Sequence, residues 1–182
     1  MADPRLSRET LLPKLAAHVL EHGLAGASLR PLARAAETSD RMLIYHFGSK
    51  DGLVTALLEH VAGMYSSALD LSYPTEPATS RRDCAQRLLA IGRAPMFAPF
   101  LRLWWEIVAG AARGDGAYRT SASAMMDSQL AWFEAHLPPD DPDPKGGARL
   151  VALAVEGALM MDALGRGEVG EAGLAALEGR PA

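Results

Sequence analysis

Residues 28–53 read SLRPLARAAETSDRMLIYHFGSKDGL, a stretch in which two short apolar-periodic segments are separated by a polar break. The first segment follows Ser28 and the second follows Thr38 and Ser39, either of which can cap it, because serine and threonine are residue types that cap helices. The second segment closes on aromatic residues before Gly48, which can end a helix. Two short helices joined by a tight turn present a small reading helix to the major groove of DNA, so this stretch predicts a helix-turn-helix.

The rest of the chain also has a helical pattern, because Ala and Leu dominate it and no alternating, β-branched run is bounded by turn residues. For the first helix we expect a start at Thr10, which places Pro13 in the first turn; a cap at Ser7 would place Pro13 deeper and kink the helix. Residues 72–80, SYPTEPATS, form the clearest linker. The predicted helices span about 10–22, 29–36, 40–47, 49–71, 81–93, 96–112, 117–136, 148–164 and 168–178.

These elements predict an all-α fold with two parts. A three-helix helix-turn-helix head, residues 1–48, is joined by a long connecting helix, residues 49–71, to a C-terminal helical bundle. The second domain as a whole, connecting helix included, spans residues 49–182. A chain of 182 residues with 49% hydrophobic and 22% charged residues is long enough to bury a core in this arrangement.

Composition also restricts the compartment. Cys84 is the only cysteine, so an intrachain disulfide is impossible and a reducing environment is expected. No apolar run is long enough to span a bilayer, and the first residues, MADPRLSR, lack the apolar core of a signal peptide. We therefore expect a soluble, cytoplasmic protein with no membrane partner.

The charge of the chain is unevenly distributed. The net charge is −4, which argues against a general nucleic-acid binder. Residues 1–50, however, carry seven Lys or Arg against five Asp or Glu, whereas the remainder carries eleven against seventeen. A mildly basic head on an acidic body is compatible with local phosphate contacts, and chance fluctuation explains so small an excess equally well.

Base-reading candidates lie at the N-terminal end of the predicted reading helix, where side chains can reach base edges. Arg41 can donate two hydrogen bonds to a guanine, an interaction worth about 1–3 kcal/mol of discrimination. Asp40 can accept from a cytosine amine, or it only favours the helix N-terminus through the dipole. The chain has no Asn, and its two Gln lie far downstream, so we expect a preference for G·C at the Arg41 position. The candidates are Ser39, Asp40, Arg41 and Met42.

Phosphate-contact candidates flank this end. Ser28 and Lys50 lie at predicted helix N-termini, where free N–H groups and the helix dipole favour anions. The alternatives are that Ser28 is only a helix cap and that Tyr45 and His46 are half-buried packing residues. The full set of candidates is Ser28, Arg30, Tyr45, His46 and Lys50.

The head resembles the N-terminal signature of the tetracycline-repressor (TetR) family of transcriptional regulators, Gly-x-x-Gly-x-Ser-x-Arg-x-(Ile/Leu)-Ala-x-x-Ala-Gly-Val-Ser-x-x-x-Leu-Tyr-x-(His/Tyr)-Phe-x-(Ser/Asn)-Lys-x-x-Leu. The resemblance covers roughly residues 5–60. Glu37 replaces the glycine of the turn, and Ile44 replaces the tyrosine, with Tyr45 one place later. Two outcomes are open at Glu37: the turn avoids the left-handed conformation, or it bears a strain of roughly 1–2 kcal/mol. The matching positions are Gly23, Gly26, Ser28, Arg30, Leu32, Ala33, Ala36, Ser39, Leu43, His46, Phe47, Ser49, Lys50 and Leu53.

The resemblance implies a repressor that binds a pseudo-palindromic operator as a homodimer, with a small molecule in the helical body changing the spacing of the heads. Bulky, adaptable apolar residues in the body are typical of a permissive pocket, although core packing explains any one of them as well. Trp104 and Trp105 point about 100° apart on one helix, so both cannot face the same core. The ligand-site candidates are Phe100, Trp104, Trp105, Met125, Met126 and Trp132.

The segment 150–164 is apolar nearly all round and must be covered on more than one side. Gly157 and Ala158 would allow another helix to approach closely. Together with the last predicted helix, this segment is the candidate for the two-fold dimer interface that the family leads one to expect. The interface candidates are Leu150, Val151, Ala154, Gly157, Ala158, Met161, Leu174 and Leu177.

Acidic residues at 106, 127, 156 and 162 lie within otherwise apolar helices. Acids near tryptophans suggest a cationic ligand, and solvated faces or ion pairs with Arg102, Arg149 or Arg166 explain them as well.

Two other classes of protein compete with the regulator. The residues His18, Glu21 and His22 match the His-x-x-Glu-His pattern of a class of zinc peptidases, so a zinc-dependent hydrolase is a remote alternative. The match is short and falls within the predicted first helix of the head, so we expect no metal site, no cofactor and no enzyme activity. The nearer alternative is a helical module that sequesters a ligand or binds a protein without specific DNA binding.

Overall fold

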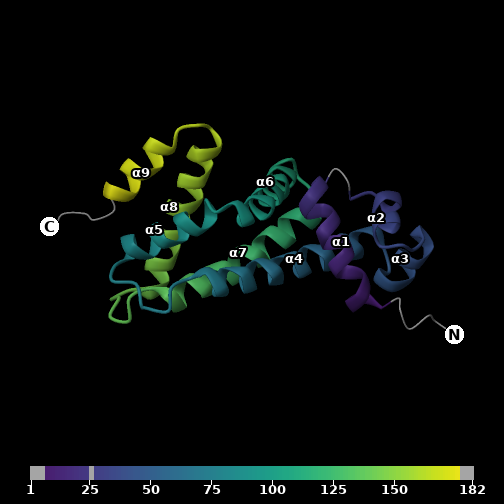
Figure 1. Cartoon of the computed structure of the whole chain (residues 1–182), viewed down its shortest axis with the longest axis horizontal. Helices are drawn as coiled ribbons and strands as arrows, with labels where there is room; N and C mark the ends of the chain where they lie inside the picture. Colours follow the sequence, from purple (N-terminus) through teal and green to yellow (C-terminus); the bar gives the residue numbers. More distant parts are fainter. Residues whose placement is uncertain (1–6, 25–26, 177–182) are drawn as a thin grey trace. The chain divides into compact units, whose positions relative to one another are not determined.

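The computed structural model describes residues 7–24 and 27–176, and within these ranges the chain is all-α with no strand, as predicted (Figure 1). The helices are α1 (Arg8–His22), α2 (Leu29–Ala35), α3 (Asp40–Phe47), α4 (Lys50–Ser72), α5 (Arg81–Gly92), the short 3₁₀ helix η2 (Pro95–Phe97), α6 (Ala98–Ala112), α7 (Gly116–His136), α8 (Pro144–Ala163) and α9 (Gly167–Ala176).

Side-chain caps explain where two of these helices begin earlier than predicted. Helix α1 starts at Arg8 because Ser7 and Thr10 cap each other: the Ser7 hydroxyl accepts from the backbone N–H of Thr10, and the Thr10 hydroxyl accepts from that of Ser7. Pro13 therefore lies inside the helix rather than in its first turn. Helix α8 starts at Pro144, because Asp143 accepts from the N–H of Gly146 at 3.0 Å.

The described residues form two compact units. The first comprises residues 7–24, 27–67 and 99–125, and the second comprises residues 68–98 and 126–176. Helices α4 and α7 each contribute residues to both units.

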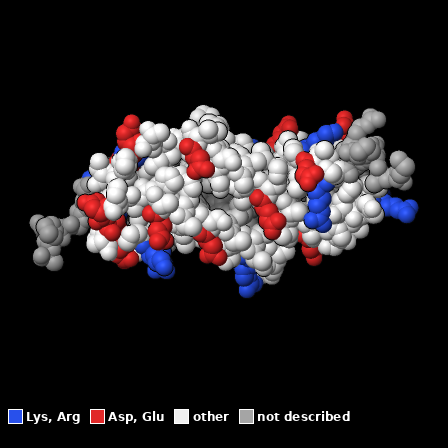
Figure 2. Space-filling model, turned by 90° about the horizontal axis from the view of Figure 1, so that it is seen from below, with Lys and Arg blue, Asp and Glu red and all other residues white. Residues whose placement is uncertain are grey.

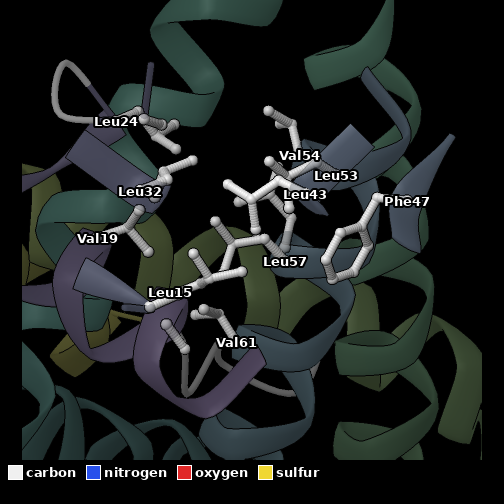
Figure 3. Close-up of a cluster of buried hydrophobic side chains, with 14 of the residues drawn as sticks. Leu15, Val19, Leu24, Leu32, Leu43, Phe47, Leu53, Val54, Leu57 and Val61 are labelled. Atoms are coloured by element: carbon white, nitrogen blue, oxygen red, sulfur yellow. The ribbon is translucent and has the colours of Figure 1, made fainter. Parts of the chain in front are cut away.

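The first unit is built around one apolar core (Figure 3). Leu15 and Val19 of α1, Leu32 of α2, Leu43 of α3 and Leu57 of α4 are all fully buried in it. Burial of each such side chain contributes about 1.5–3 kcal/mol. Leu103 and Ile107 of α6 join the same core. The short helices α2 and α3 are therefore held by tertiary packing rather than by their own helix propensity.

The second unit contains α5, α8 and α9. Helices α8 and α9 approach closely at Gly170, where an added Cβ would lie 2.9 Å from the Cα of Ala158. Arg81 of α5 donates two hydrogen bonds to Asp141, at 2.7 and 2.6 Å, and these bonds hold the pKa of the Asp141 carboxyl below its usual range.

Candidate nucleic-acid interface

Helices α2 and α3 form the predicted helix-turn-helix. Leu43 and Phe47 turn inward from α3, and Leu32 turns inward from α2. The hydroxyl of Ser39 accepts from the N–H of Met42 at 3.3 Å, so Ser39 caps α3 as its sequence position predicts. The buried face fixes which side chains α3 presents to solvent, and these are the side chains available to DNA.

The turn between the two helices is left-handed at Glu37, whose φ is 54°. Of the two outcomes open for this position, the structure thus has the strained one. Lys14 of α1 forms an ion pair with the Glu37 carboxylate, and this hydrogen bond holds the pKa of Glu37 below its usual range. The pair lies on the surface, where ion pairs stabilise a fold only slightly.

The base-reading candidates occupy the start of α3 as predicted. Ser39 and Arg41 are exposed, and Asp40 and Met42 are half-buried. Asp40 lies in the first turn, where a carboxylate also interacts favourably with the helix dipole. Arg41 is thus exposed at the N-terminal end of α3, where a residue that recognises guanine would have to lie.

Among the phosphate candidates, Tyr45 is 70% exposed and does not serve as a packing residue. Its ring contacts that of His46 edge-on at 5.2 Å. His46 is half-buried, and its Nε2 is enclosed without a hydrogen-bond partner. Packing therefore remains a sufficient account of His46 but not of Tyr45.

The remaining phosphate candidates are exposed at the starts of helices. Ser28 stands at the N-cap position of α2, but its hydroxyl makes no capping hydrogen bond, which corrects the cap role expected from the sequence. Arg30 is exposed in the first turn of α2, and Lys50 is exposed as the first residue of α4. The Ser28 hydroxyl is thus available to a phosphate oxygen.

Charge is not gathered into a basic surface on the face that Figure 2 shows, where blue Lys and Arg side chains lie apart among red Asp and Glu. This agrees with the net charge of −4. DNA binding by such a surface depends on a few well-placed cations rather than on a broad positive field.

The ligand-site candidates fall into two groups. Phe100 and Met125 are half-buried against the core of the first unit, and Phe100 contacts the ring of Tyr65 edge-on at 5.8 Å. Trp104 and Trp105, in the same unit, are both half-buried. Packing against this core already accounts for Phe100 and Met125. The other two candidates, Met126 and Trp132, belong to the second unit.

Trp132 lies in an aromatic cluster within the second unit. Its indole N–H donates to Asp70 at 2.5 Å, and its ring stacks on that of His136 with the ring centres 3.6 Å apart. Tyr73 meets both rings edge-on. Burial and a hydrogen bond with Cys84 raise the pKa of the Tyr73 hydroxyl well above its usual range.

Two of the acids in the apolar helices, Glu106 and Asp162, have partners other than those expected. The Glu106 carboxylate accepts from the backbone N–H of Leu24 at 2.6 Å. Asp162 pairs with Arg93, which holds the pKa of Asp162 below its usual range. Both acids thus have structural roles, which the sequence could not assign because the partners are distant along the chain.

The apolar faces of α8 and α9 leave an open groove of about 390 Å³ that contains most of the predicted dimer residues. The prediction of Val151 as an interface residue is wrong, because this side chain is fully buried within the chain and does not line the groove. Leu177 lies outside the described residues. Leu153, which is not among the predicted residues, also lines the groove and is 74% exposed. The groove is lined by Leu150, Leu153, Ala154, Gly157, Ala158, Met161, Val169, Gly170, Gly173 and Leu174.

The His18 and His22 rings stack on one another, with centres 4.4 Å apart. Nδ1 of His22 lies 3.1 Å from the carbonyl oxygen of His18. Residues 7–24 and 27–176 contain no group of three or more His, Cys, Asp or Glu side chains that could hold a metal ion. In the same part of the chain, no helix is both long enough and apolar enough to cross a membrane.

The sequence profile described as "Bacterial regulatory proteins, tetR family" matches residues 15–57, which run from α1 into α4. The HTH-type transcriptional repressor NicS of Pseudomonas putida is 29% identical over 75 residues, a match that covers 38% of this chain and only 35% of that repressor.

Solved structures resemble the whole chain. A TetR-family transcriptional regulator from Rhodococcus sp. has a TM-score of 0.69 at 22% identity, and the match covers 94% of this chain and 96% of the other. The multidrug binding protein EbrR, solved with imidazole, has a TM-score of 0.69 at 21% identity, and the match covers 99% of this chain and 93% of EbrR. EbrR has also been solved with proflavin, and that structure matches equally well.

Proposed function

We propose that this chain is a transcriptional repressor of the tetR family, whose sequence profile matches residues 15–57, and that it reads its operator with α3. The observation that carries the proposal is the division of α3 into two faces. Leu43 and Phe47 are buried, whereas Arg41 and Tyr45 are exposed on a short helix capped by Ser39. A reading helix needs this division, because its inner face holds the fold and its outer face meets the groove.

Six of the nine candidate residues then have a role in contacting DNA. Arg41 recognises a guanine, and Asp40 either accepts from a cytosine amine or only stabilises the helix start. Arg30 and Lys50 provide charge for the phosphates on either side, and Ser28 and Tyr45 provide hydroxyl groups. A regulator of this kind would act in the cytoplasm.

The repressor would bind as a homodimer through α8 and α9. Supporting this are the large apolar side chains that α8 leaves exposed, including Leu153 at 74% and Met160 at 44%. A contiguous apolar surface of this kind typically marks an interface. Two heads in one dimer would require an operator with two half-sites in two-fold symmetry.

A small-molecule effector would bind in the helical body and change the spacing of the heads. EbrR supports this proposal, because that protein binds imidazole and proflavin and resembles this chain in fold. Trp104 and Trp105 are the strongest candidates to line the site, because these two large side chains point about 100° apart on α6 and cannot both face the same core. Phe100, Met125, Met126 and Trp132 are weaker candidates.

The test is selection of bound duplexes from random DNA with the full chain, followed by footprinting of the selected sequence. We expect protection of a pseudo-palindrome and an affinity that falls steeply with salt, because each neutralised phosphate releases counterions. Failure to enrich any sequence would refute the repressor and favour the alternative of a helical ligand-sequestering or protein-binding module.

A further inference from the structure

Arg8, the first residue of α1, contacts the far end of the reading helix. Its Nε donates a hydrogen bond of 2.6 Å to the backbone carbonyl of His46, in the last turn of α3. Its guanidinium lies over the ring of Phe47, with 5.3 Å from the central carbon to the ring centre. The Arg8 side chain thus contacts both the backbone of α3 at His46, thirty-eight residues further along the chain, and the buried ring of Phe47.

The position of Arg8 is unfavourable for its own helix. A cation in the first turn opposes the helix dipole of α1, whereas a cation at the C-terminal end of α3 complements the dipole of that helix. The carbonyl of His46 is also one of the last four in α3, which have no partner within the helix. The charge and the hydrogen bond of Arg8 therefore stabilise α3 rather than α1.

Helix α3 needs an external support of this kind. It has only eight residues, and isolated helices of that length are marginal in water. Ser39 holds its start, and Phe47 and Leu43 hold its inner face. The hydrogen bond from Arg8 adds a fixed point at its end, which limits rotation and fraying of the turn that carries Tyr45.

We propose that Arg8 is a positioning residue for base reading: it acts through α3 and not on the DNA. The inference rests on the proposed function, because it concerns the precision with which α3 meets the groove. Side chains of a recognition site must be held to about 0.5 Å for productive contacts. Lysine can replace the charge of Arg8 but not its planar group, which bonds the carbonyl and covers the ring at once.

The test compares Arg8→Ala and Arg8→Lys with the wild-type chain on two labelled duplexes, the selected sequence and a scrambled version of it. For Arg8→Ala we expect the ratio of the two affinities to fall about tenfold, with the salt dependence of binding unchanged. Arg8→Lys should recover part of the ratio. Arg119→Ala, which removes an exposed arginine from α7 of the same unit, should leave the ratio at the wild-type value.

A second readout does not need DNA. Hydrogen exchange on the free protein should be faster for the amides of residues 44–48 in Arg8→Ala than in the wild-type chain, while the amides of α2 are unaffected. An unchanged affinity ratio or unchanged exchange would overturn the inference. The inference would also be overturned if Arg8→Ala lowered the slope of log affinity against log salt concentration by about one, because Arg8 would then contact a phosphate itself.

The two proposals fail separately. If the wild-type chain enriches no duplex, the repressor function is refuted and the exchange measurement alone decides whether Arg8 anchors α3. Faster exchange then still supports the anchor, and unchanged exchange refutes it.

Discussion

Arg41 is the one side chain at the start of α3 that can recognise a guanine through two hydrogen bonds. It is exposed, and no Asn is present anywhere in the chain to read adenine instead. The specificity of the proposed repressor should therefore depend on this single residue more than on its neighbours.

We expect Arg41→Ala to weaken binding to the selected duplex about 5- to 150-fold per half-site, since a bidentate contact is worth about 1–3 kcal/mol. Preference for G·C at one position of each half-site should disappear. Lys50→Ala is the contrasting variant: it should weaken binding to all sequences alike and lower the salt slope by about one. Retention of the G·C preference by Arg41→Ala, in titrations against single-position variants of the duplex, would refute the assignment.

Glu37 has the left-handed conformation that glycine adopts without strain. We expect Glu37→Gly to raise the melting temperature by about 2 °C, because relief of the strain exceeds the loss of a surface ion pair. Lys14→Ala, which breaks the same ion pair and keeps the strain, should change the melting temperature little. A lower melting temperature in Glu37→Gly would mean that the pair with Lys14 outweighs the strain.

At the scale of elements, local signals in the sequence predicted most of the fold. The caps at Ser39 and the break at Gly48 place α3 within a residue, because both act on the adjoining turn. Helices α1 and α8 start earlier than predicted, since α1 is capped by Ser7, which the sequence offered only as the alternative to a start at Thr10, and α8 is capped by Asp143.

Long-range contacts explain the remaining features that the sequence did not predict. The roles of Phe100 and Met125 depend on the packing of α6 and α7 against the core of the first unit, which no local pattern records. Val151 turns inward on a helix that is apolar nearly all round, so its periodicity could not distinguish the covered face from the open one. The bond between Arg8 and His46 has no sequence signal at all beyond a cation at an unfavourable helix end.

The end of α1 depends on α6. Gly23 has a φ of 74°, and an added Cβ there would lie 2.4 Å from Oε1 of Glu106, whose carboxylate also accepts from the N–H of Leu24. We expect Gly23→Ala to destabilise the fold through both strain and the loss of that hydrogen bond. Gly114→Ala is a matched control, because Gly114 also has a positive φ, of 95°, but open space around it.

The expected difference between these variants is measurable by thermal unfolding. Gly114→Ala should cost only the strain, about 1–2 kcal/mol, or roughly 2–8 °C in melting temperature for a chain of this size. Gly23→Ala should cost more. Equal melting temperatures for the two variants would show that Glu106 does not hold the end of α1.

The link between α5 and Asp141 should make the second unit sensitive to acid. Because Arg81 lowers the pKa of Asp141 in the folded state, the stabilisation is present above the unfolded value of about 3.9 and is lost as the pH falls through the folded value. Asp141→Asn should therefore lower the melting temperature at pH 7. Between pH 4 and pH 2 the melting temperature of this variant should fall less than that of the wild-type chain. Asp140→Asn, at the exposed neighbour, should follow the wild-type curve.

At the scale of the whole molecule, the open groove on α8 and α9 provides a test of assembly that is separate from DNA binding. Gly157 lines the groove, and an added Cβ there would meet nothing within 4 Å. A side chain at this position is therefore compatible with the single chain but would obstruct a second copy that packs into the groove. We expect Gly157→Glu to fold normally and to be monomeric where the wild-type chain is a dimer, because it places a charge in an apolar interface.

Gly63→Glu in α4 is the matched control, since an added Cβ at Gly63 also meets nothing within 4 Å and Gly63 lies outside the groove. Light scattering after size exclusion should give a dimer mass for the wild-type chain and for Gly63→Glu, and a monomer mass for Gly157→Glu. The monomer should also lose most of its affinity for the selected duplex, because each head then binds its half-site alone. A dimeric Gly157→Glu would exclude this groove as the interface and require the two heads to be paired through another surface.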